Sequence, residues 1–426
     1  MARKMKDSGI EWIGEIPEGW ETIKLKNIVS IVRGGSPRPI EAYMSDNDND
    51  VNWIRISDTE KGSKYITHAC RKLISSGISK SRFIKRGSLI LTNSMSFGEP
   101  YILAIDGCIH DGWVAFSDFT KIDKEFLYYF LVSPLAKLQF EQQVDGGVVK
   151  NLNIDKIGDT IILLPPYNEQ NKIIAYLDCF TSNIDLLLSK TISSVEEYKK
   201  LKQAVITQAV TKGVRGKREM KDSGVEWIGE IPKEWDILNL VAHTSMLTPM
   251  RDRPENLDGP IPWIRIEDFD GKYISSSKAS LGVSKETVQS MNLKIYPVGT
   301  ILCTSSCIMG KCAIVSRELV SNQRFIGIIP DQNTCENFLY YLMLSNSERM
   351  NYLATGALQA NLSRSSFEHL KVQFPSYQEQ KEIADYLDAK CAEIDGLIAK
   401  KEQLVKELES YKKSLIYEVV TGKREV

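Results

Sequence analysis

The sequence predicts an α+β protein with two mixed α/β domains, each followed by a long helix, and the two helices are expected to pair as an antiparallel coiled coil. Three observations support this prediction of a pseudo-twofold tandem repeat. One segment occurs twice, two long stretches share the same helical pattern of apolar residues, and the intervening parts contain short β-rich runs.

The duplicated segment reads MKDSGIEWIGEIPEGW at 5–20 and MKDSGVEWIGEIPKEW at 220–235, with 13 of 16 positions identical. The offset, 220 − 5 = 215, is about half of the 426 residues, so one large unit has been duplicated in tandem. Three further blocks match in the same order: VNWIRISD (51–58) with IPWIRIED (261–268), FLYYFLVS (126–133) with FLYYLMLS (338–345), and PPYNEQNKIIAYLD (165–178) with PSYQEQKEIADYLD (375–388). Between these blocks the halves diverge, so one scaffold carries two sets of variable segments, and we expect two sites.

Composition is ordinary for a soluble protein, with 42% hydrophobic and 26% charged residues. No apolar run approaches the ~20 residues that span a bilayer, and no signal peptide opens the sequence, so we expect a cytoplasmic protein without a membrane segment. Eight cysteines do not make a disulfide framework in a chain of this length.

The net charge of −1 argues against a simple basic DNA-binding domain, but the charges are unevenly distributed. Residues 61–98 contain eight Lys or Arg and no acid, and residues 271–317 contain six Lys or Arg with Glu286 as the only acid. A neutral total can therefore hide one basic face per repeat, although two solvated charge runs would give the same count.

The two long helices are predicted at 168–213 and 378–422, each ending at a glycine (Gly213, Gly422). Their apolar positions recur every three or four residues in the same register, which indicates a 3.5-residue coiled-coil period. The residues expected on the helix stripes, where helices or partners would pack, are Ile173, Leu177, Ile184, Leu187, Leu201, Val205, Ile383, Leu387, Ile394, Leu397, Leu408 and Leu415. The alternative is that each helix packs only on its own domain.

The globular parts contain β-rich runs such as 52–56 and 88–92, and helices are expected at 123–132 and 335–344. Their loops are rich in Arg, Lys, Asn, Gln and Ser, which read base edges or hold phosphates. The candidate DNA-binding residues are Arg33, Ser36, Arg38, Asn93, Ser94, Lys150 and Asn151 in the first half, and Arg251, Arg253, Ser305, Ser306, Lys311, Asn322, Arg324, Gln359, Asn361 and Arg364 in the second. Solvated loop side chains are the alternative for each of them. Arg55 and Arg265 belong to the shared scaffold and are expected to be structural or to bind phosphate.

Sequence motifs for catalysis and for metal or cofactor binding are missing or incomplete. Cys303, Cys307 and Cys312 could form a zinc site, but Leu91, Met95 and Pro100 occupy the matching places in the first half, which favours buried thiols. The run Leu164-Pro165-Pro166-Tyr167 lacks the polar first residue of the Asn/Asp-Pro-Pro-aromatic motif of enzymes that methylate amino groups, so we interpret it as a strand-to-helix turn. With no Gly-rich phosphate loop and no metal-ligand pattern among four histidines, the chain is expected to bind and not to catalyse, holding no metal and no cofactor of its own.

The MKDSGxEWIGEIPxxW segment, the PxYxEQxxIAxYLD entry to a long helix and the VTxG helix end resemble the specificity subunit of Type I restriction-modification systems. The resemblance covers nearly the whole chain, twice and in the family's order. It implies two target recognition domains held apart by two antiparallel conserved helices, each domain reading one half of a split, asymmetric DNA sequence. It also implies that the helices dock two modification subunits, which carry S-adenosylmethionine and methylate adenine, and that restriction subunits add ATP-driven translocation and cleavage.

On this resemblance, the target recognition domains are 20–165 and 235–375. The remaining segments are a conserved N-terminal segment (1–19), a central spacer helix (166–216), the repeated conserved segment (217–234) and a C-terminal spacer helix (376–426). We further expect the repeated segment to be a joint, with Trp12 and Ile13 docking near Val419-Val420 as Trp227 and Ile228 dock near Val210.

Two other functions remain open at this point. The chain could be a scaffold whose helices and globular ends bind proteins, in which case it would show no sequence preference on DNA. It could instead be an independent methyltransferase, which would have to bind S-adenosylmethionine alone.

Overall fold

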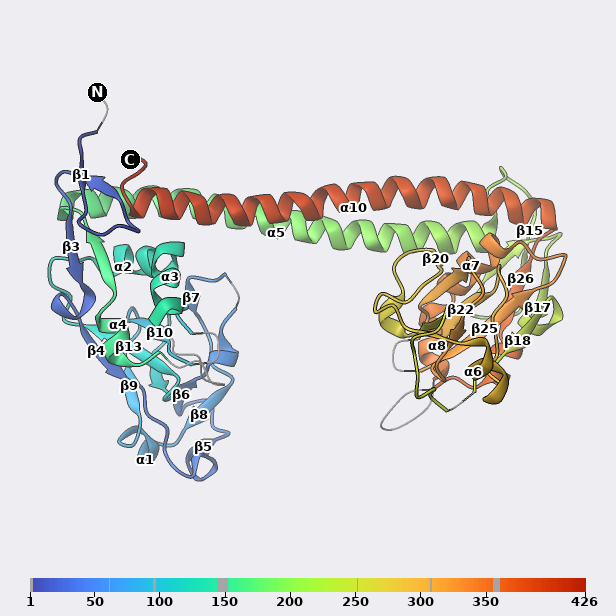
Figure 1. Ribbon diagram of the computed structural model, residues 1–426, viewed down its shortest axis with the longest axis horizontal. Helices are drawn as coiled ribbons and strands as arrows, with labels where there is room; N and C mark the ends of the chain where they lie inside the picture. The colour runs from blue at the N-terminus through green and yellow to red at the C-terminus, as the bar shows by residue number, and fades with distance from the viewer. Residues whose placement is uncertain are drawn as a thin grey trace. The chain divides into compact units, whose positions relative to one another are not determined.

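The computed structural model describes residues 3–60, 62–94, 97–143, 152–250, 252–306, 309–354 and 361–426 (Figure 1). The chain divides into two compact units: unit 1 comprises Met1–Thr191 with Gln403–Val426, and unit 2 comprises Ile192–Glu402. The division passes through both long helices, α5 (Tyr167–Lys212) and α10 (Tyr377–Val420). Each unit therefore contains one globular part and a stretch of both helices.

Unit 1 is built on two five-stranded sheets. The first sheet has the order β4 (Ser30–Arg33), β13 (Trp113–Ser117), β10 (Leu89–Thr92), β11 (Pro100–Leu103) and β7 (Tyr65–Ile66). The second has the order β5 (Met44–Ser45), β8 (Arg71–Leu73), β6 (Val51–Ile54), β12 (Gly107–Ile109) and β9 (Arg82–Ile84). Two small antiparallel pairs, β1 (Met5–Asp7) with β2 (Glu15–Pro17) and β3 (Glu21–Lys24) with β14 (Ile161–Leu164), complete the strands of unit 1.

The helices of unit 1 are α1 (Ser75–Ile78), α2 (Lys124–Val132), α3 (Pro134–Gln143), α4 (Ile154–Gly158) and the first part of α5. Asp123 caps α2 by accepting a hydrogen bond from the Glu125 amide, as a short carboxylate at an N-cap does. The apolar face of α2 lies in one core with the start of α5 and the end of α10, which includes Phe126, Ile173 and Leu415. This core holds the sheet domain on the helices.

Unit 2 repeats this architecture. Its main sheet has the order β18 (Thr244–Leu247), β25 (Phe325–Pro330), β22 (Ile301–Thr304), β23 (Cys312–Val315) and β20 (Tyr273–Ile274). A second sheet contains β21 (Gly282–Val283), β19 (Ile261–Ile264) and β24 (Val320–Ser321), and the two small pairs are β15 (Met220–Asp222) with β16 (Glu230–Pro232) and β17 (Asp236–Asn239) with β26 (Lys371–Phe374). The helices are α6 (Lys285–Ser290), α7 (Glu336–Ser345), α8 (Ser347–Leu353), α9 (Arg364–Glu368) and the larger part of α10.

The long helices pack against each other antiparallel within each unit. In unit 1 Lys412 contacts Asp185, and Arg424, farther along the chain, lies beside Tyr176 on an earlier turn of α5. In unit 2 Lys202 contacts Asp395, with 2.6 Å between Nζ and Oδ2. The two ion pairs correspond, since 185 + 210 = 395 and 202 + 210 = 412. The predicted fold class is confirmed, and the helix bounds differ from the prediction by one or two residues.

The buried stripe of the long helices follows the predicted 3.5-residue period but differs in register from part of the predicted stripe. Thr181, Thr191 and Val195 are buried, whereas Leu187 and Leu201 are exposed. From Leu177 to Ala209 buried or half-buried positions of α5 recur in alternating steps of four and three residues (177, 181, 184, 188, 191, 195, 198, 202, 205 and 209), so the 3.5-residue period holds, and Leu187 and Leu201 each lie one position before this seam. Of the twelve predicted stripe residues, Leu187, Leu201 and Leu397 are exposed and the other nine are buried or half-buried.

The repeated MKDSG segment forms a small hairpin in both units. Ile13 and Ile16 are buried in one core with Val419 and Val420, as Ile231 is with Val210. Gly422 lies against this hairpin, because a Cβ there would sit 2.4 Å from Pro17 Cγ. The expected joint is confirmed for Ile13, while Trp12 and Trp227 are about two-fifths exposed and lie outside these cores.

The fold bears on several smaller expectations. The Leu-Pro-Pro-Tyr run joins β14 to α5, and its counterpart joins β26 to α10, which confirms the strand-to-helix turns. Among the described residues no helix has the length and apolar character needed to cross a bilayer. Cys303 and Cys312 lie opposite each other on β22 and β23, in the positions of Leu91 and Pro100, and are buried. Cys307 lies outside the described residues, and within them no metal-binding cluster is present.

Candidate nucleic-acid interface

The candidate residues of unit 1 that the structure describes gather where β10 ends and β13 begins. The Asn93 amide donates to the Gly112 carbonyl, and the Leu152 amide donates to the Asn93 carbonyl. These backbone bonds tie together the turn after β10, the turn before β13 and the segment before α4. Ser94 is next to this meeting point, because a Cβ on Gly112 would lie 2.9 Å from the Ser94 hydroxyl.

Asp111 organises the polar side chains of this edge. Arg33 donates from Nε to the Asp111 carbonyl at 2.9 Å, and Ser36 donates from its hydroxyl to the Asp111 carboxylate at 2.6 Å. The Ser36 hydrogen bond lowers the pKa of Asp111 below its ordinary value, so this group stays ionised. Arg38 lies 3.7 Å from the same carboxylate and is otherwise exposed. Asp111 thus holds the guanidinium groups of Arg33 and Arg38 at the same edge of the sheet.

His110 fixes the turn that carries Asp111. Its Nδ1 accepts a hydrogen bond from the Gly112 amide at 2.8 Å, and its ring lies between Trp53 and Trp113, with a centroid distance of 6.2 Å to each. Burial lowers the pKa of His110 below its ordinary 6.5, which keeps the imidazole neutral and Nδ1 free to accept. The Asn93 side-chain oxygen is buried nearby and has no hydrogen-bond partner among the residues described.

Unit 2 has the same backbone hydrogen bonds at this edge but different side chains. The Ser305 amide donates to the Arg324 carbonyl at 2.8 Å, and the Leu362 amide donates to the Ser305 carbonyl at 2.9 Å. Asn322 takes the place of His110, because its side-chain oxygen accepts from the Arg324 amide at 3.0 Å. The residues corresponding to His110-Asp111-Gly112 are therefore Asn322-Gln323-Arg324.

The other candidates of unit 2 are more scattered. Ser306 forms a β-bridge with Asn361, so these two lie together at the edge. Lys311 is exposed at the far side of the β22–β23 turn, with its amide bonded to the Thr304 hydroxyl. Arg253 is exposed, and Arg364 begins α9 and pairs with Glu368 at 2.7 Å.

Four of the predicted residues fall outside the described ranges: Lys150, Asn151, Arg251 and Gln359. Arg55 and Arg265, expected to be structural or phosphate-binding, each begin a short helical turn and donate their amides to Asp58 and Asp268. Sequence reasoning missed His110 and Asp111, whose signal was the turn-forming Asp-Gly pair before an aromatic strand.

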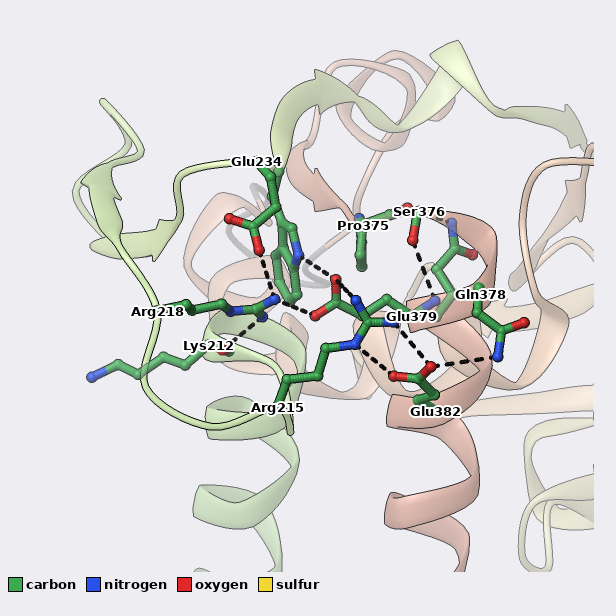
Figure 2. A network of polar contacts seen from close by, with 11 residues as sticks. Lys212, Arg215, Arg218, Glu234, Pro375, Ser376, Gln378, Glu379 and Glu382 are labelled. Carbon is green, nitrogen blue, oxygen red and sulfur yellow. Dashed lines mark hydrogen bonds and ion pairs between the residues drawn. The ribbon is translucent and has the colours of Figure 1, made fainter.

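The recurrent Glu-Gln pair of the helix entry organises a second polar network, drawn for unit 2 in Figure 2. Glu379 is almost completely buried, accepts from Trp235 Nε1 at 3.0 Å and lies 2.6 Å from Arg218 Nη1. In unit 1 Glu169 likewise accepts a hydrogen bond from Trp20 Nε1 and forms an ion pair with Arg3. The neighbouring Gln380 donates to the Pro375 and Asn333 carbonyls and accepts from the Cys335 amide, which fixes the start of α7.

The comparisons with known proteins agree with this architecture. The family model of the Type I restriction modification DNA specificity domain matches residues 17–197 and 236–407. The specificity subunit of the Type I restriction enzyme MjaIX from Methanocaldococcus jannaschii is 34% identical over 168 residues, which cover 38% of each protein. The putative MjaX specificity subunit of that organism is 25% identical over 436 residues, covering 96% of this chain and 95% of the relative.

A solved structure gives the same fold. One chain from a structural study of the complex assembly and conformational transition of the type I R-M system superimposes with a TM-score of 0.74. The two sequences are 14% identical, and the match covers 96% of this chain and 99% of that one. Since the family model matches most of both halves, the chain belongs to the Type I restriction-modification DNA specificity family and contains two copies of its domain. Specificity subunits recognise DNA and are not themselves enzymes, and this chain is a member of that non-catalytic class.

Proposed function

We propose that each unit reads one half of a bipartite, asymmetric DNA sequence and that the chain thereby directs a Type I complex to methylate or restrict DNA. The long helices dock two modification subunits, which bind S-adenosylmethionine, and restriction subunits supply the ATP-dependent steps. The chain itself binds no cofactor, and the complex works in the cytoplasm.

The observation that carries this proposal is one backbone frame with two different sets of side chains. The turn before β13 in unit 1 reads His110-Asp111-Gly112, and the turn before β25 in unit 2 reads Asn322-Gln323-Arg324, held by equivalent backbone bonds. A reader of two unlike half-sites needs a common scaffold and divergent polar edges, because base discrimination comes from side-chain donors and acceptors.

The arginines at the unit 1 edge divide into two roles. Arg33 is anchored through Nε to the Asp111 carbonyl, which leaves its terminal nitrogens for the paired acceptors of a guanine. Arg38 has a side chain that is 83% exposed and suits phosphate contact. Replacing Arg33 should relax one base position, whereas replacing Arg38 should weaken binding to all sequences.

Docking of the modification subunits is supported by apolar side chains that the chain leaves uncovered. Leu187, Leu201 and Leu397 lie on the long helices and are 52%, 48% and 36% exposed. Replacing the three with serine should weaken assembly with the modification subunit without changing the half-sites that are read.

The decisive experiment is methylome sequencing of cells that express the complete system. It should give two short half-sites separated by an indifferent gap, and a single contiguous site would overturn the proposal. Exchanging residues 235–375 for the matching segment of another specificity subunit should change one half-site only. If both halves change, the units do not read independently.

A further inference from the structure

Lys64 lies where the sheet of unit 1 meets helix α5. It directly precedes β7, and its ammonium group lies 2.6 Å from the Asp178 carboxylate on α5 and 2.7 Å from Glu125 on α2. The Tyr129 hydroxyl donates to the same Asp178 oxygen. One lysine therefore joins the edge strand, α2 and α5.

This contact is shielded from solvent. The Lys64 side chain is only 15% exposed, and its nitrogen lies 4.7 Å from the ring centroid of Tyr129. Burial alone would lower the pKa of Lys64, but the hydrogen bonds to Asp178 and Glu125 outweigh it and the pKa lies above its ordinary value. Lys64 remains charged and fixed between its partners.

Unit 2 contains the same joint. Lys272 contacts Asp388 on α10, the Tyr341 hydroxyl donates to that carboxylate at 2.6 Å, and the Lys272 nitrogen lies 5.1 Å from the Tyr341 ring. Both lysines open a Lys-Tyr-Ile sequence, at 64–66 and 272–274. The joints differ at one position, because Glu125 of the first corresponds to Asn337, which accepts from the Tyr273 hydroxyl in the second.

Each joint is connected to the reading edge by a continuous sheet. In unit 1, β7 pairs with β11, β11 pairs with β10, and β10 ends beside Asn93. In unit 2, β20 pairs with β23 and β23 pairs with β22, which ends beside Ser305. A rotation at the lysine would carry the reading edge with it, since the hydrogen-bonded strands move as one body.

We propose that Lys64 and Lys272 are positioning residues that fix the angle of each recognition domain on its helix and so set the gap length that the protein accepts. The inference rests on the proposed function. One base pair of gap changes the separation of half-sites by about 3.4 Å and their relative rotation by about 35°. Only a stiff joint penalises a change of that size.

The test is methylation by the assembled complex of DNA targets with the natural gap and with gaps one base pair shorter and longer. Lys64→Met and Lys272→Met keep the apolar stem over the tyrosines and remove the charge. We expect each to reduce the preference for the natural gap about fivefold, with both half-site sequences unchanged. Lys64→Arg keeps a cation beside Asp178 and Glu125 and should retain the preference.

Lys24→Met is the control, because the Lys24 ammonium pairs with Asp159 inside the same domain and not with an aspartate of α5. It should leave the gap preference unchanged. The inference is overturned if the methionine variants keep the wild-type gap preference, or if Lys24→Met relaxes it equally. If wild-type protein recognises no bipartite target at all, the proposed function fails instead, so the two failures are distinguishable.

Discussion

Replacing Glu379 with glutamine tests the polar network at the start of α10. Glu379 is 2% exposed and serves Trp235 and Arg218 together (Figure 2). Glutamine can still accept the Trp235 hydrogen bond through its oxygen, but its amide then turns two donors toward Arg218. The variant therefore removes a buried negative charge while almost preserving shape and packing.

The magnitude follows from what Arg218 retains. Breaking a buried ion pair by removing one partner costs about 3–5 kcal/mol. Arg218 is 14% exposed and keeps Glu234 at 2.9 Å and the Lys212 carbonyl at 3.0 Å, so we expect the lower end, about 3 kcal/mol. The equivalent Glu169→Gln in unit 1 should cost about 1 kcal/mol, because Glu169 and Arg3 are both about one-fifth exposed.

The assay is urea unfolding followed by circular dichroism, with hydrogen exchange to assign each transition to a unit, because two units need not unfold together. Glu382→Gln is the control, since Glu382 pairs with Arg215 on the exposed side of the same network. It should destabilise unit 2 much less than Glu379→Gln does. Equal effects of the two variants would refute the argument from burial.

Three further predictions concern unit 1. The pKa of His110 is lowered by burial, so the unfolded chain binds more protons below pH 6.5 and the stability of unit 1 should fall as pH drops below that value. His110→Asn, which copies Asn322, should flatten this dependence in urea titrations between pH 7.5 and 5.5, and an unchanged slope would contradict it. Gly422→Ala should lower the free energy of unfolding by about 3 kcal/mol, because the new Cβ would clash with Pro17. Gly14→Ala is the control, since Gly14 has a similar positive φ but open space around it, and it should cost about 1 kcal/mol. Equal unfolding midpoints for the two variants would exclude the clash. Deleting residues 1–19 should accelerate hydrogen exchange at the end of α10, where Val419 and Val420 lose Ile13 and Ile16; unchanged exchange would show that the hairpin does not support the helix.

Prolines and glycines at the helix ends made the bounds of the long helices predictable. Pro165 and Pro166 before α5, and Gly213 and Gly422 after the two helices, set bounds that differ from the structure by one or two residues. The burial of Thr191 and the exposure of Leu187 were not predictable from an apolar stripe, because residue type does not reveal which face a neighbouring helix covers. Leu187 and Leu201 each lie one position before the buried seam, so the sequence predicted the period of the seam but not its register along the whole helix.

The candidate site was predictable in composition but not in arrangement. Arg33, Ser36 and Arg38 were selected as donors, yet their common anchor, Asp111, is 73 or more residues away in sequence and reaches them only through strand pairing. No role was assigned to His110 from the sequence, because its hydrogen bond from the Gly112 amide to Nδ1 depends on the conformation of the turn. Such contacts depend on how distant strands pair, and that pairing could not be predicted from one sequence with irregular loops.

The recurring motifs of this chain hold each recognition domain on its helices. The Glu-Gln pair of the helix entry secures Trp20 or Trp235 and the start of α2 or α7, and the Lys-Tyr-Ile motif reaches the aspartate of the Tyr-Leu-Asp motif. By contrast, the turns at the reading edge share backbone bonds but not side chains. A protein that must change its target without losing its geometry requires this division, because edge substitutions then alter base readout while the joints keep each edge on its helix. The duplicated sequence therefore records which contacts fix position, and the divergent sequence records which contacts select DNA.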